Sequence, residues 1–306
     1  MAKRKRKKQI SWICVGFCLL VALSVLWQLY PPSRWSDKAV TFDENTLTVR
    51  FLDVGQGDCA LLCQGDTAAL IDAGTVERPN AVYEMVSSYG ITQLDAVFVS
   101  HPHADHIGGL PKLLEELPVN AVYMQTPPES LPVEGHYYAK TLKILDEKTI
   151  TRIEPQPDEQ YVFGGMTVTV IGPLKLNVED LNDYSLCLRV DYGKRSFLFC
   201  GDMTEVEERS LLQRDGGLSA DVLKVAHHGS GGSSSRTFVQ AVSPEIAVIS
   251  CGLYNDFGHP HASAMTRLTA AGATLYRTDK QGTVTVTTDG TALSVSTEKT
   301  TNDETS

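Results

Sequence analysis

Hydrophobic and polar positions alternate along Thr46–Val54, where apolar side chains recur at Leu47, Val49 and Phe51. A period of two is typical of a β-strand that buries one face. Similar short apolar runs, rich in β-branched and aromatic residues, continue along the chain. They predict further strands at 59–63, 67–72, 94–100, 120–124, 166–172, 185–192, 195–202, 221–227, 245–252, 273–278 and 282–288.

Helical spacing of apolar residues falls between several of these strands. One helix is predicted to open at Thr204, because Thr204 and Glu207 have the spacing of a capping box. The stretch 125–160, rich in proline and charge, predicts an insertion with one helix near 138–147. Further helices are predicted at 78–90, 108–117, 204–215, 234–242 and 263–272.

Strands mixed with helices, without a long linker, predict one α/β domain over residues 46–296. Residues 297–306 are polar and have nothing to bury, so we expect a disordered tail.

The first 45 residues have a different composition. Residues 10–29 carry no charge, and at ~1.5 Å per residue they are long enough to cross a bilayer. Six of the first eight residues are basic, which favours a cytoplasmic N-terminus. A cleaved signal peptide is the alternative, but no convincing cleavage site precedes Pro31. We therefore expect a basic head at 1–8, a single-pass transmembrane signal anchor at 9–30, a linker at 31–45 and an extracytoplasmic domain.

The charge of this domain bears on its partners. The formal net charge is −10, and the basic head contributes +6, so the remainder carries −16. Dedicated nucleic-acid binders normally show a basic stripe. The acidic remainder restricts any contact with DNA to a short, local one, and no protein partner is predicted.

The chain has seven cysteines, of which Cys14 and Cys18 lie in the uncharged segment. The other five lie in apolar, strand-like runs and are odd in number. Buried free thiols explain them better than a disulfide framework.

Three of the eight histidines lie in the stretch VSHPHADHIGGL, as His101, His103 and His106, together with Asp105. Imidazole and carboxylate groups are the nitrogen and oxygen ligands of zinc-like metals. On a loop that leaves a strand, His101 and His103 can face one ion, while Asp105 and His106 face a second. Two adjacent ions are typical of hydrolytic sites.

The pattern H-x-H-x-D-H after a strand resembles the signature of the metallo-β-lactamase superfamily. The stretches FLDVGQGDCALL, ALIDAG, NDYSLCLRV, FLFCGD, VLKVAHHGSGGSSS, GHPHAS and YRTDKQGTVTV follow in the order of its ComEC-like subfamily. That subfamily comprises the exported hydrolase-like domain of the ComEC competence protein and its stand-alone relatives. The resemblance covers most of residues 47–287 and implies a four-layer αββα sandwich.

The resemblance also implies the roles of individual residues. Most superfamily members have a further histidine where this chain has DLNDYS, so Asn182 or Asp183 is expected near the first ion. An oxygen ligand there makes manganese as plausible as zinc. His227 is expected to lie beside the site, with His228 as the ligand. The implied metal ligands are His101, His103, Asp105, His106, Asn182, Asp202 as a bridge, and His228, and the implied catalytic residues are Asp72, which orients the histidines, Asp105 and His261.

Two further stretches predict substrate contacts. Backbone N–H groups and the hydroxyls of Ser230 and Ser233 in Gly229–Ser235 suit a phosphate, although a flexible turn is the alternative. The resemblance places His259 and His261 at the rim of the site.

These features predict a membrane-anchored hydrolase with two divalent ions, zinc or manganese, and a metal-bound hydroxide as nucleophile. The expected substrate is a phosphodiester, such as single-stranded DNA or a cell-wall polymer. The alternatives are a lactamase, lactonase or thioesterase, and a non-catalytic accessory protein with a degenerate site.

Overall fold

The structure is a computed structural model, and it describes the predicted α/β domain. The predicted basic head, the predicted transmembrane segment and most of the linker lie outside the described residues. Within the part that the structure describes, no helix is both long and apolar enough to cross a membrane. The described residues are 42–133, 135–175, 178–214 and 217–299.

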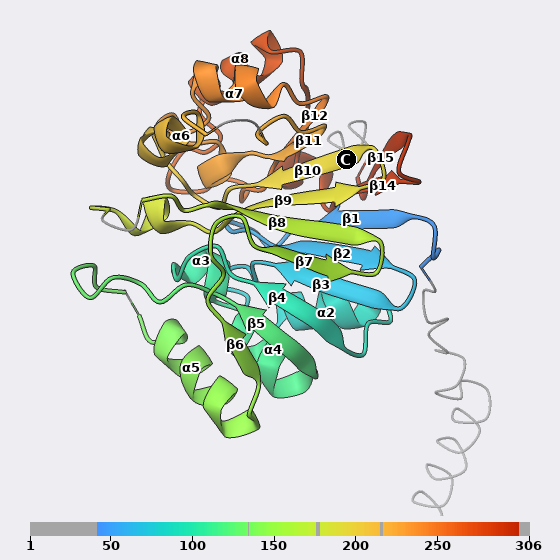
Figure 1. Cartoon of the computed structure of the whole chain (residues 1–306), viewed down its shortest axis with the longest axis vertical. Helices are drawn as coiled ribbons and strands as arrows, with labels where there is room; N and C mark the ends of the chain where they lie inside the picture. The colour runs from blue at the N-terminus through green and yellow to red at the C-terminus, as the bar shows by residue number, and fades with distance from the viewer. Residues whose placement is uncertain (1–41, 134, 176–177, 215–216, 300–306) are drawn as a thin grey trace, which may run out of the picture. The chain divides into compact units, whose positions relative to one another are not determined.

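Two β-sheets form the centre of this domain (Figure 1). The first sheet has eight strands in the order β15-β14-β1-β2-β3-β4-β5-β6. Strands β3 to β6 pair in parallel, and the other pairs are antiparallel. The strands are β1 (Leu47–Phe51), β2 (Ala60–Gln64), β3 (Thr67–Ile71), β4 (Leu94–Phe98), β5 (Val119–Tyr123), β6 (Thr151–Ile153), β14 (Val284–Thr288) and β15 (Leu293–Thr297).

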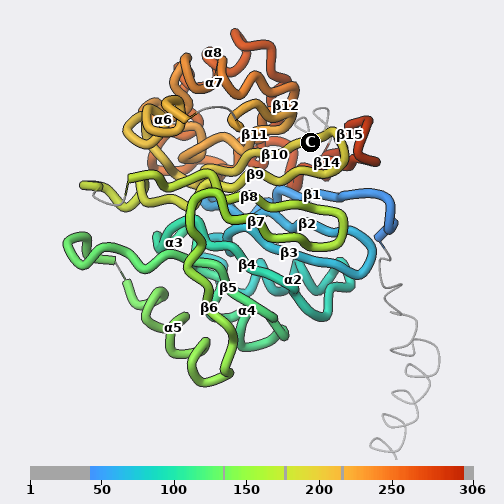
Figure 2. The backbone as a smooth tube through the Cα atoms, viewed as in Figure 1, coloured from blue at the N-terminus to red at the C-terminus, as the bar shows by residue number. Residues whose placement is uncertain are grey.

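The second sheet has seven strands in the order β13-β12-β11-β10-β9-β8-β7, in which β10 to β13 pair in parallel and the other pairs are antiparallel. The chain builds most of the first sheet, then all of the second, and returns to the first with β14 and β15 (Figure 2). The strands are β7 (Gln160–Phe163), β8 (Met166–Gly172), β9 (Cys187–Tyr192), β10 (Arg195–Phe199), β11 (Val222–Lys224), β12 (Ile246–Ile249) and β13 (Thr274–Arg277).

Three apolar cores hold four layers together. The inner faces of the sheets share one core, in which Phe51 stacks on Phe199 at 5.8 Å between ring centroids. Helices cover both outer faces. Helix α4 buries Leu110, Leu113 and Leu114, a spacing that places all three on one face of an amphipathic helix. This is the α/β sandwich that the resemblance implied. The helices are α2 (Ala81–Ser88), α3 (Ala104–Ile107), α4 (Leu110–Glu116), α5 (Tyr137–Lys148), α6 (Glu205–Leu211), α7 (Arg236–Val242), α8 (Ala262–Ala270) and α9 (Thr278–Gln281), with 3₁₀ turns η2 (Leu181–Tyr184) and η3 (Ala226–Gly229).

All strands predicted from the apolar runs are present, and α5 is the helix predicted near 138–147. Three strands were missed, β6, β7 and β15, and all three are short and have no fully buried residue. The tail prediction began too early, because Thr297 ends β15 and the N–H groups of Glu298 and Lys299 bond to Thr283 and Gln281.

The cysteine prediction is confirmed for the described part of the chain, where all five thiols are buried and free. The capping box is only half formed. Thr204 caps α6 by accepting from Val206 N, whereas the carboxylate of Glu207 is buried and accepts from Leu174 N.

Candidate metal centre

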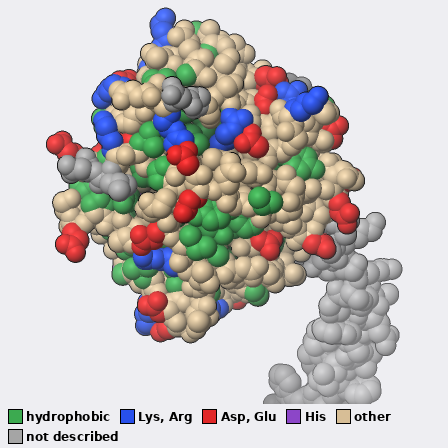
Figure 3. Space-filling model, in the orientation of Figure 1, with side chains coloured by type: hydrophobic (Ala, Val, Ile, Leu, Met, Phe, Trp, Pro, Cys, Tyr) green, Lys and Arg blue, Asp and Glu red, His purple; other side chains and the backbone are tan. Residues whose placement is uncertain are grey.

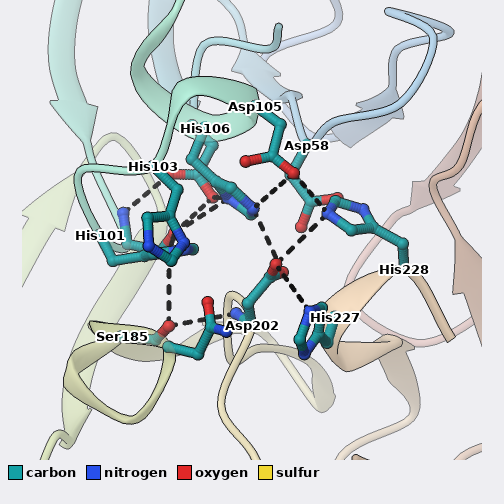
Figure 4. A network of polar contacts seen from close by, with 12 residues as sticks. Asp58, His101, His103, Asp105, His106, Ser185, Asp202, His227 and His228 are labelled. Atoms are coloured by element: carbon teal, nitrogen blue, oxygen red, sulfur yellow. Dashed lines mark hydrogen bonds and ion pairs between the residues drawn. The ribbon is translucent and has the colours of Figure 1, made fainter. Parts of the chain in front are cut away.

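The predicted site residues follow the carboxyl ends of parallel strands. Asp72 follows β3 and His101 follows β4 in the first sheet, while Asp202 follows β10 and His228 follows β11 in the second. Since these strand ends meet at one edge of the sandwich, side chains from both halves of the chain converge there (Figure 4).

The segment after β4 carries its candidate ligands on two kinds of backbone, an extended part and one helical turn. Its backbone is extended as far as His103, which has φ −69° and ψ 152° and precedes α3. One helical turn then begins, in which the N–H groups of His106 and Ile107 both donate to the carbonyl of His103. After this change from extended to helical backbone, Asp105 and His106 contact His228 and Asp202, whereas His101 and His103 contact each other.

Asp105, His106, Asp202 and His228 form what we call the four-ligand group, whose ligand atoms all lie within 4.8 Å of one another. Asp202 lies between the two histidines, 3.2 Å from His106 Nε2 and 3.3 Å from His228 Nε2 (Figure 4). Asp105 Oδ2 is 3.1 Å from His228 Nε2. Nitrogen and oxygen ligands at 2.0–2.2 Å from a tetrahedral ion are roughly 3.3–3.6 Å apart. Three of the separations are close to this range, whereas His106 Nε2 and Asp105 Oδ2 are 4.0 Å apart.

Two atoms of the four-ligand group lack hydrogen-bond partners. His106 Nε2 and Asp202 Oδ1 are buried and face each other as an ion pair at 3.2 Å, but neither makes a hydrogen bond to any described residue. Unsatisfied buried polar atoms are costly and therefore rare. An ion bound by both atoms would satisfy them, so the residues present fit a divalent metal.

His101 and His103 form a separate pair next to the four-ligand group. His101 Nε2 and His103 Nδ1 are 2.9 Å apart, and the rings of His101 and His106 are 4.2 Å apart between centroids. Among the described residues, no group of three or more His, Cys, Asp or Glu ligands includes this pair. Binding of a first ion by His101 and His103 therefore remains a prediction, because the pair would need further ligands.

The loop before β9 was expected to supply such a ligand. Asp183 is engaged elsewhere, because its carboxylate accepts from the backbone N–H and the hydroxyl of Thr204. Asn182 Oδ1 is buried and has no hydrogen-bond partner among the described residues, so the role of Asn182 stays a prediction. Ser185 was not predicted as a site residue, yet its Oγ lies 3.4 Å from His101 Nδ1 and accepts from Asp202 N.

Asp72 lies behind His106 rather than in the open site. Its carboxylate is buried, 2.9 Å from His106 Nδ1, and it accepts from the backbone N–H and hydroxyl of Ser100. Burial raises the pKa of Asp72, and the contact with His106 lowers it by less. A carboxylate behind a ligand histidine fixes the tautomer and orientation of the ring, so Asp72 is a positioning residue.

Asp58, which was not predicted as a site residue, lies behind His228 and forms an ion pair with it, while the hydrogen bond of His228 Nδ1 goes to the backbone. Its Oδ1 lies 3.2 Å from His228 Nδ1, which is also 3.0 Å from Ser250 O. Lys224 Nζ lies 2.5 Å from Asp58 Oδ2, and both residues are buried. Burial raises the pKa of Asp58, but Lys224 and His228 together lower it further, so the carboxyl is held ionised.

The sequence pattern around Asp58 and Lys224 gave little indication that they belong to the site. Asp58 ends the stretch DVGQGD, which reads equally well as a turn, and Lys224 is a single charge in an apolar strand. The pairing is visible only once β2 and β11, from different sheets, are placed together.

The carboxylates around the two ligand histidines favour the protonated form of each ring. Burial lowers the pKa of His106 and of His228, but the surrounding carboxylates, led by Asp202, raise both well above the ordinary value. Burial and the neighbouring His106 instead lower the pKa of His101. A metal ion that binds to the four-ligand group must displace the protons of His106 and His228.

The turn that presents His228 has an uncommon backbone. His227 and His228 both have positive φ, at 52° and 54°. Consecutive left-handed residues other than glycine are rare and cluster at functional sites. His227 Nε2 lies 3.8 Å from Asp202 Oδ2 and its side chain is partly exposed, which places it beside the four-ligand group as expected.

The predicted phosphate loop, Gly229–Ser235, needs correction. Ser233 is fully buried and its hydroxyl donates to Met203 O, so it is closed to substrate. The N–H groups from Ser230 to Ser235 already donate to acceptors within the protein, including the carboxylate of Glu208. The loop is therefore neither a flexible turn nor an open anion cradle. Ser230 keeps a partly exposed position.

His259 and His261 lie next to one another beyond this loop, 5.0 Å apart between ring centroids, and His259 is 6.1 Å from the ring of His228. Gly231 N donates to His261 Nδ1 at 2.8 Å. A neutral imidazole that accepts at Nδ1 carries its proton on Nε2, so His261 can donate to a bound molecule. Burial and the neighbouring histidines lower the pKa of His259 to about 4.

Comparison with known proteins agrees with this geometry. The family model described as "Metallo-beta-lactamase superfamily" matches residues 52–253, and the chain belongs to this superfamily. The fold, the family and the ligand cluster together define a metal-dependent hydrolase. Within the superfamily the chain is a ComEC-like member.

Two curated relatives support that assignment. The chain is 31% identical to "Competence protein ComA" of Neisseria gonorrhoeae over 78% of this chain and 32% of the relative. It is 29% identical to "ComE operon protein 3" of Bacillus subtilis over 77% of this chain and 32% of the relative. The chain therefore spans about a third of the length of these relatives.

Solved structures show the same fold at low sequence identity. The metallo-beta-lactamase fold protein YhfI of Bacillus subtilis has a TM-score of 0.50 and 16% identity, over 76% of this chain and 96% of YhfI. The diiron β-hydroxylase CmlA of Streptomyces venezuelae has a TM-score of 0.52 and 15% identity, over 78% of this chain and 53% of CmlA.

Asp202 is expected to be essential for metal binding, because it contacts both ligand histidines. We predict that the protein, supplied with manganese or zinc, binds about one to two ions per chain, and that Asp202→Ala loses most of them. Elemental analysis after gel filtration measures this. Asp66→Ala, in an exposed hairpin turn, is the control and should retain the metal. Full metal content in Asp202→Ala would contradict the assignment.

The pair Lys224–Asp58 is expected to be strongly coupled. Lys224→Met should lower the free energy of unfolding by about 3–5 kcal/mol, because it leaves a buried carboxylate without its cation. Adding Asp58→Asn, which removes the charge but keeps an acceptor for His228, should restore part of that loss. Urea unfolding of the two single variants and the double variant measures the coupling, and purely additive losses would show that the pair does not interact.

Proposed function

We propose that the protein hydrolyses phosphodiesters. The observation that carries the proposal is the ligand set, in which two carboxylates, Asp105 and Asp202, join two imidazoles around one position. Carboxylate-rich sites accept hard ions as well as zinc, and such ions suit phosphoryl oxygens. The competence proteins among the relatives, and the ComEC-like motifs of the sequence, also favour a phosphodiester.

Divalent ions bound at this centre would act as Lewis acids, lowering the pKa of an attacking water and offsetting the charge that develops at phosphorus. The protein supplies the geometry. The carboxylate of Asp72 holds Nδ1 of His106, and the carbonyl of Ser250 holds Nδ1 of His228, with Asp58 beside it as a counter-charge. Both Nε2 atoms then face Asp202. Positioned groups of this kind cost no reorganisation during the reaction.

His261 is the proposed donor to the substrate. Because its Nδ1 accepts from Gly231 N, its Nε2–H is free to donate to a non-bridging oxygen or to the leaving group. Proton transfer to a leaving alkoxide by a positioned histidine is worth about 10²–10⁴-fold in rate.

Charge argues against a long nucleic-acid strand as substrate. On the face drawn in Figure 3, lysine and arginine side chains are interspersed with aspartate and glutamate instead of forming a continuous stripe. The chain outside its basic head also carries the excess negative charge noted above. A short single strand, or a phosphodiester of a cell-wall polymer, therefore suits the protein better than duplex DNA.

Diester hydrolysis should depend on added metal and be inhibited competitively by inorganic phosphate. His261→Ala should lower turnover of bis(p-nitrophenyl) phosphate by roughly 10²–10⁴-fold while the metal remains bound. His228→Ala should lose both metal and activity. His136→Ala, on an exposed residue before α5, is the control.

The same assay separates the alternative functions. Hydrolysis of nitrocefin or a lactone, without activity on any phosphodiester, would refute the proposal in favour of a lactamase or lactonase. Inactivity on every substrate despite full metal loading would identify a binding protein.

We further propose that this activity lies outside the cell, with the protein anchored by residues 9–30. The support is the uncharged run after the basic head. Protease added to intact protoplasts should then digest the domain, and complete protection of the domain would exclude this topology.

A further inference from the structure

Arg267 lies on α8, the helix that begins directly after His261. Its guanidinium donates three hydrogen bonds, and all three go to backbone carbonyls of the loop Gly229–Ser235. Nε donates to Ser234 O at 2.6 Å, and Nη2 donates to Ser233 O at 2.7 Å and to Gly231 O at 3.1 Å. This one side chain therefore holds most of the length of the loop.

His261 contacts the same loop from the start of α8. Its backbone N–H donates to Gly229 O at 2.9 Å, and its Nδ1 accepts from Gly231 N at 2.8 Å. Gly231 is thus held on both sides, because its carbonyl accepts from Arg267 and its N–H donates to His261. The hydrogen bond at one ring nitrogen of a histidine sets which nitrogen carries the proton. The position of Gly231 therefore sets the orientation and the tautomer of the His261 ring.

Glu208 holds the other end of the loop. Its buried carboxylate accepts from Ser234 N and Ser235 N, which lie beyond the residue that contacts His261. Gly231 has no side chain with which to pack, and it is partly exposed. The hydrogen bond from Arg267 to its carbonyl is therefore the contact by which α8 fixes Gly231 next to His261.

The chemistry of this contact requires an arginine. A guanidinium has five N–H donors in a rigid, planar fork, whereas the ammonium group of a lysine is a single point of donation on a flexible stem. Three carbonyl acceptors around one side chain match the fork. The side chain of Arg267 is also partly buried, so its contacts are more than those of a surface charge.

We propose that Arg267 is a positioning residue for His261. The proposal rests on the proposed phosphodiesterase function, in which His261 donates a proton from Nε2. By fixing Gly231 N against His261 Nδ1, Arg267 keeps the proton of the neutral ring on Nε2 and holds the ring in one orientation. Arg267 bonds to the loop and not to the four-ligand group, so the metal content should not depend on it.

A double-mutant cycle tests whether Arg267 acts through His261. Arg267→Met removes the donors, and it should lower kcat for bis(p-nitrophenyl) phosphate by roughly tenfold, with little change in KM, because a positioned proton donor acts mainly in the transition state. In the His261→Ala background the same change should have little further effect. Arg267→Lys should retain part of the rate. Arg209→Met, the same change at an exposed arginine of α6, is the control.

Histidine nitrogen NMR of the zinc-loaded protein reads the ring directly and does not require activity. The resonances of His261, assigned by their loss in His261→Ala, should show a protonated Nε2 and an unprotonated Nδ1. Arg267→Met should shift this ring toward a mixture of tautomers. Gly231→Ala should have the same effect, because the added Cβ would lie 3.3 Å from His261 Nδ1 and displace the ring.

The two measurements distinguish the failure of this proposal from the failure of the proposed function. A change of tautomer in Arg267→Met, when the unaltered protein hydrolyses no diester, would support the positioning and refute the phosphodiesterase. An unchanged tautomer would overturn the positioning alone, and so would equal losses of kcat in the two backgrounds. Loss of metal from Arg267→Met would also overturn it, because Arg267 would then act on the metal centre. If Arg267→Met does not fold, Arg267→Lys gives the same comparison.

Discussion

The buried carboxylate of Asp202 is the group on which the rest of the site depends. It lies between two histidines whose outer nitrogens face two further buried carboxylates, Asp72 and Asp58. So many ionisable groups can be buried together only if each has a partner of opposite charge or a metal ion. Lys224, on strand β11 of the second sheet, contributes to this charge balance because it forms an ion pair with Asp58.

The fold meets this requirement by bringing parallel strand ends from both sheets to one edge. The first half of the chain contributes His106 with its positioning carboxylate, and the second half contributes Asp202 and His228. The two histidines are supported differently, because Asp72 makes a hydrogen bond to His106, whereas Asp58 faces His228 as an ion pair and Ser250 O takes the hydrogen bond. Asp72 and His106 both belong to the first half, whereas Asp58 reaches across to His228.

Much of this arrangement could be predicted from the sequence, because period-two alternation and the histidine spacing are local signals. The four-ligand group was foreseen in full, through the resemblance to the superfamily. Strands β6, β7 and β15 were missed because their half-exposed residues give little apolar contrast. The pairing of Lys224 with Asp58 and the use of the Gly229–Ser235 amides by Glu208 could not be foreseen, since both join segments far apart in sequence.

The division of the ligands between the two halves of the chain has a consequence for how the protein matures. Asp105 and His106 are synthesised early, but the group is incomplete until His228 has been made and β11 has joined its sheet. A nascent chain that ends before Asp202 contains only two of the four ligands, and one that ends before His228 contains three. An ion that needs all four ligands would thus bind late, and the affinities of such sites for different divalent ions overlap. The ion that the protein carries is then chosen by the supply in the compartment where folding is completed, as much as by the ligands themselves.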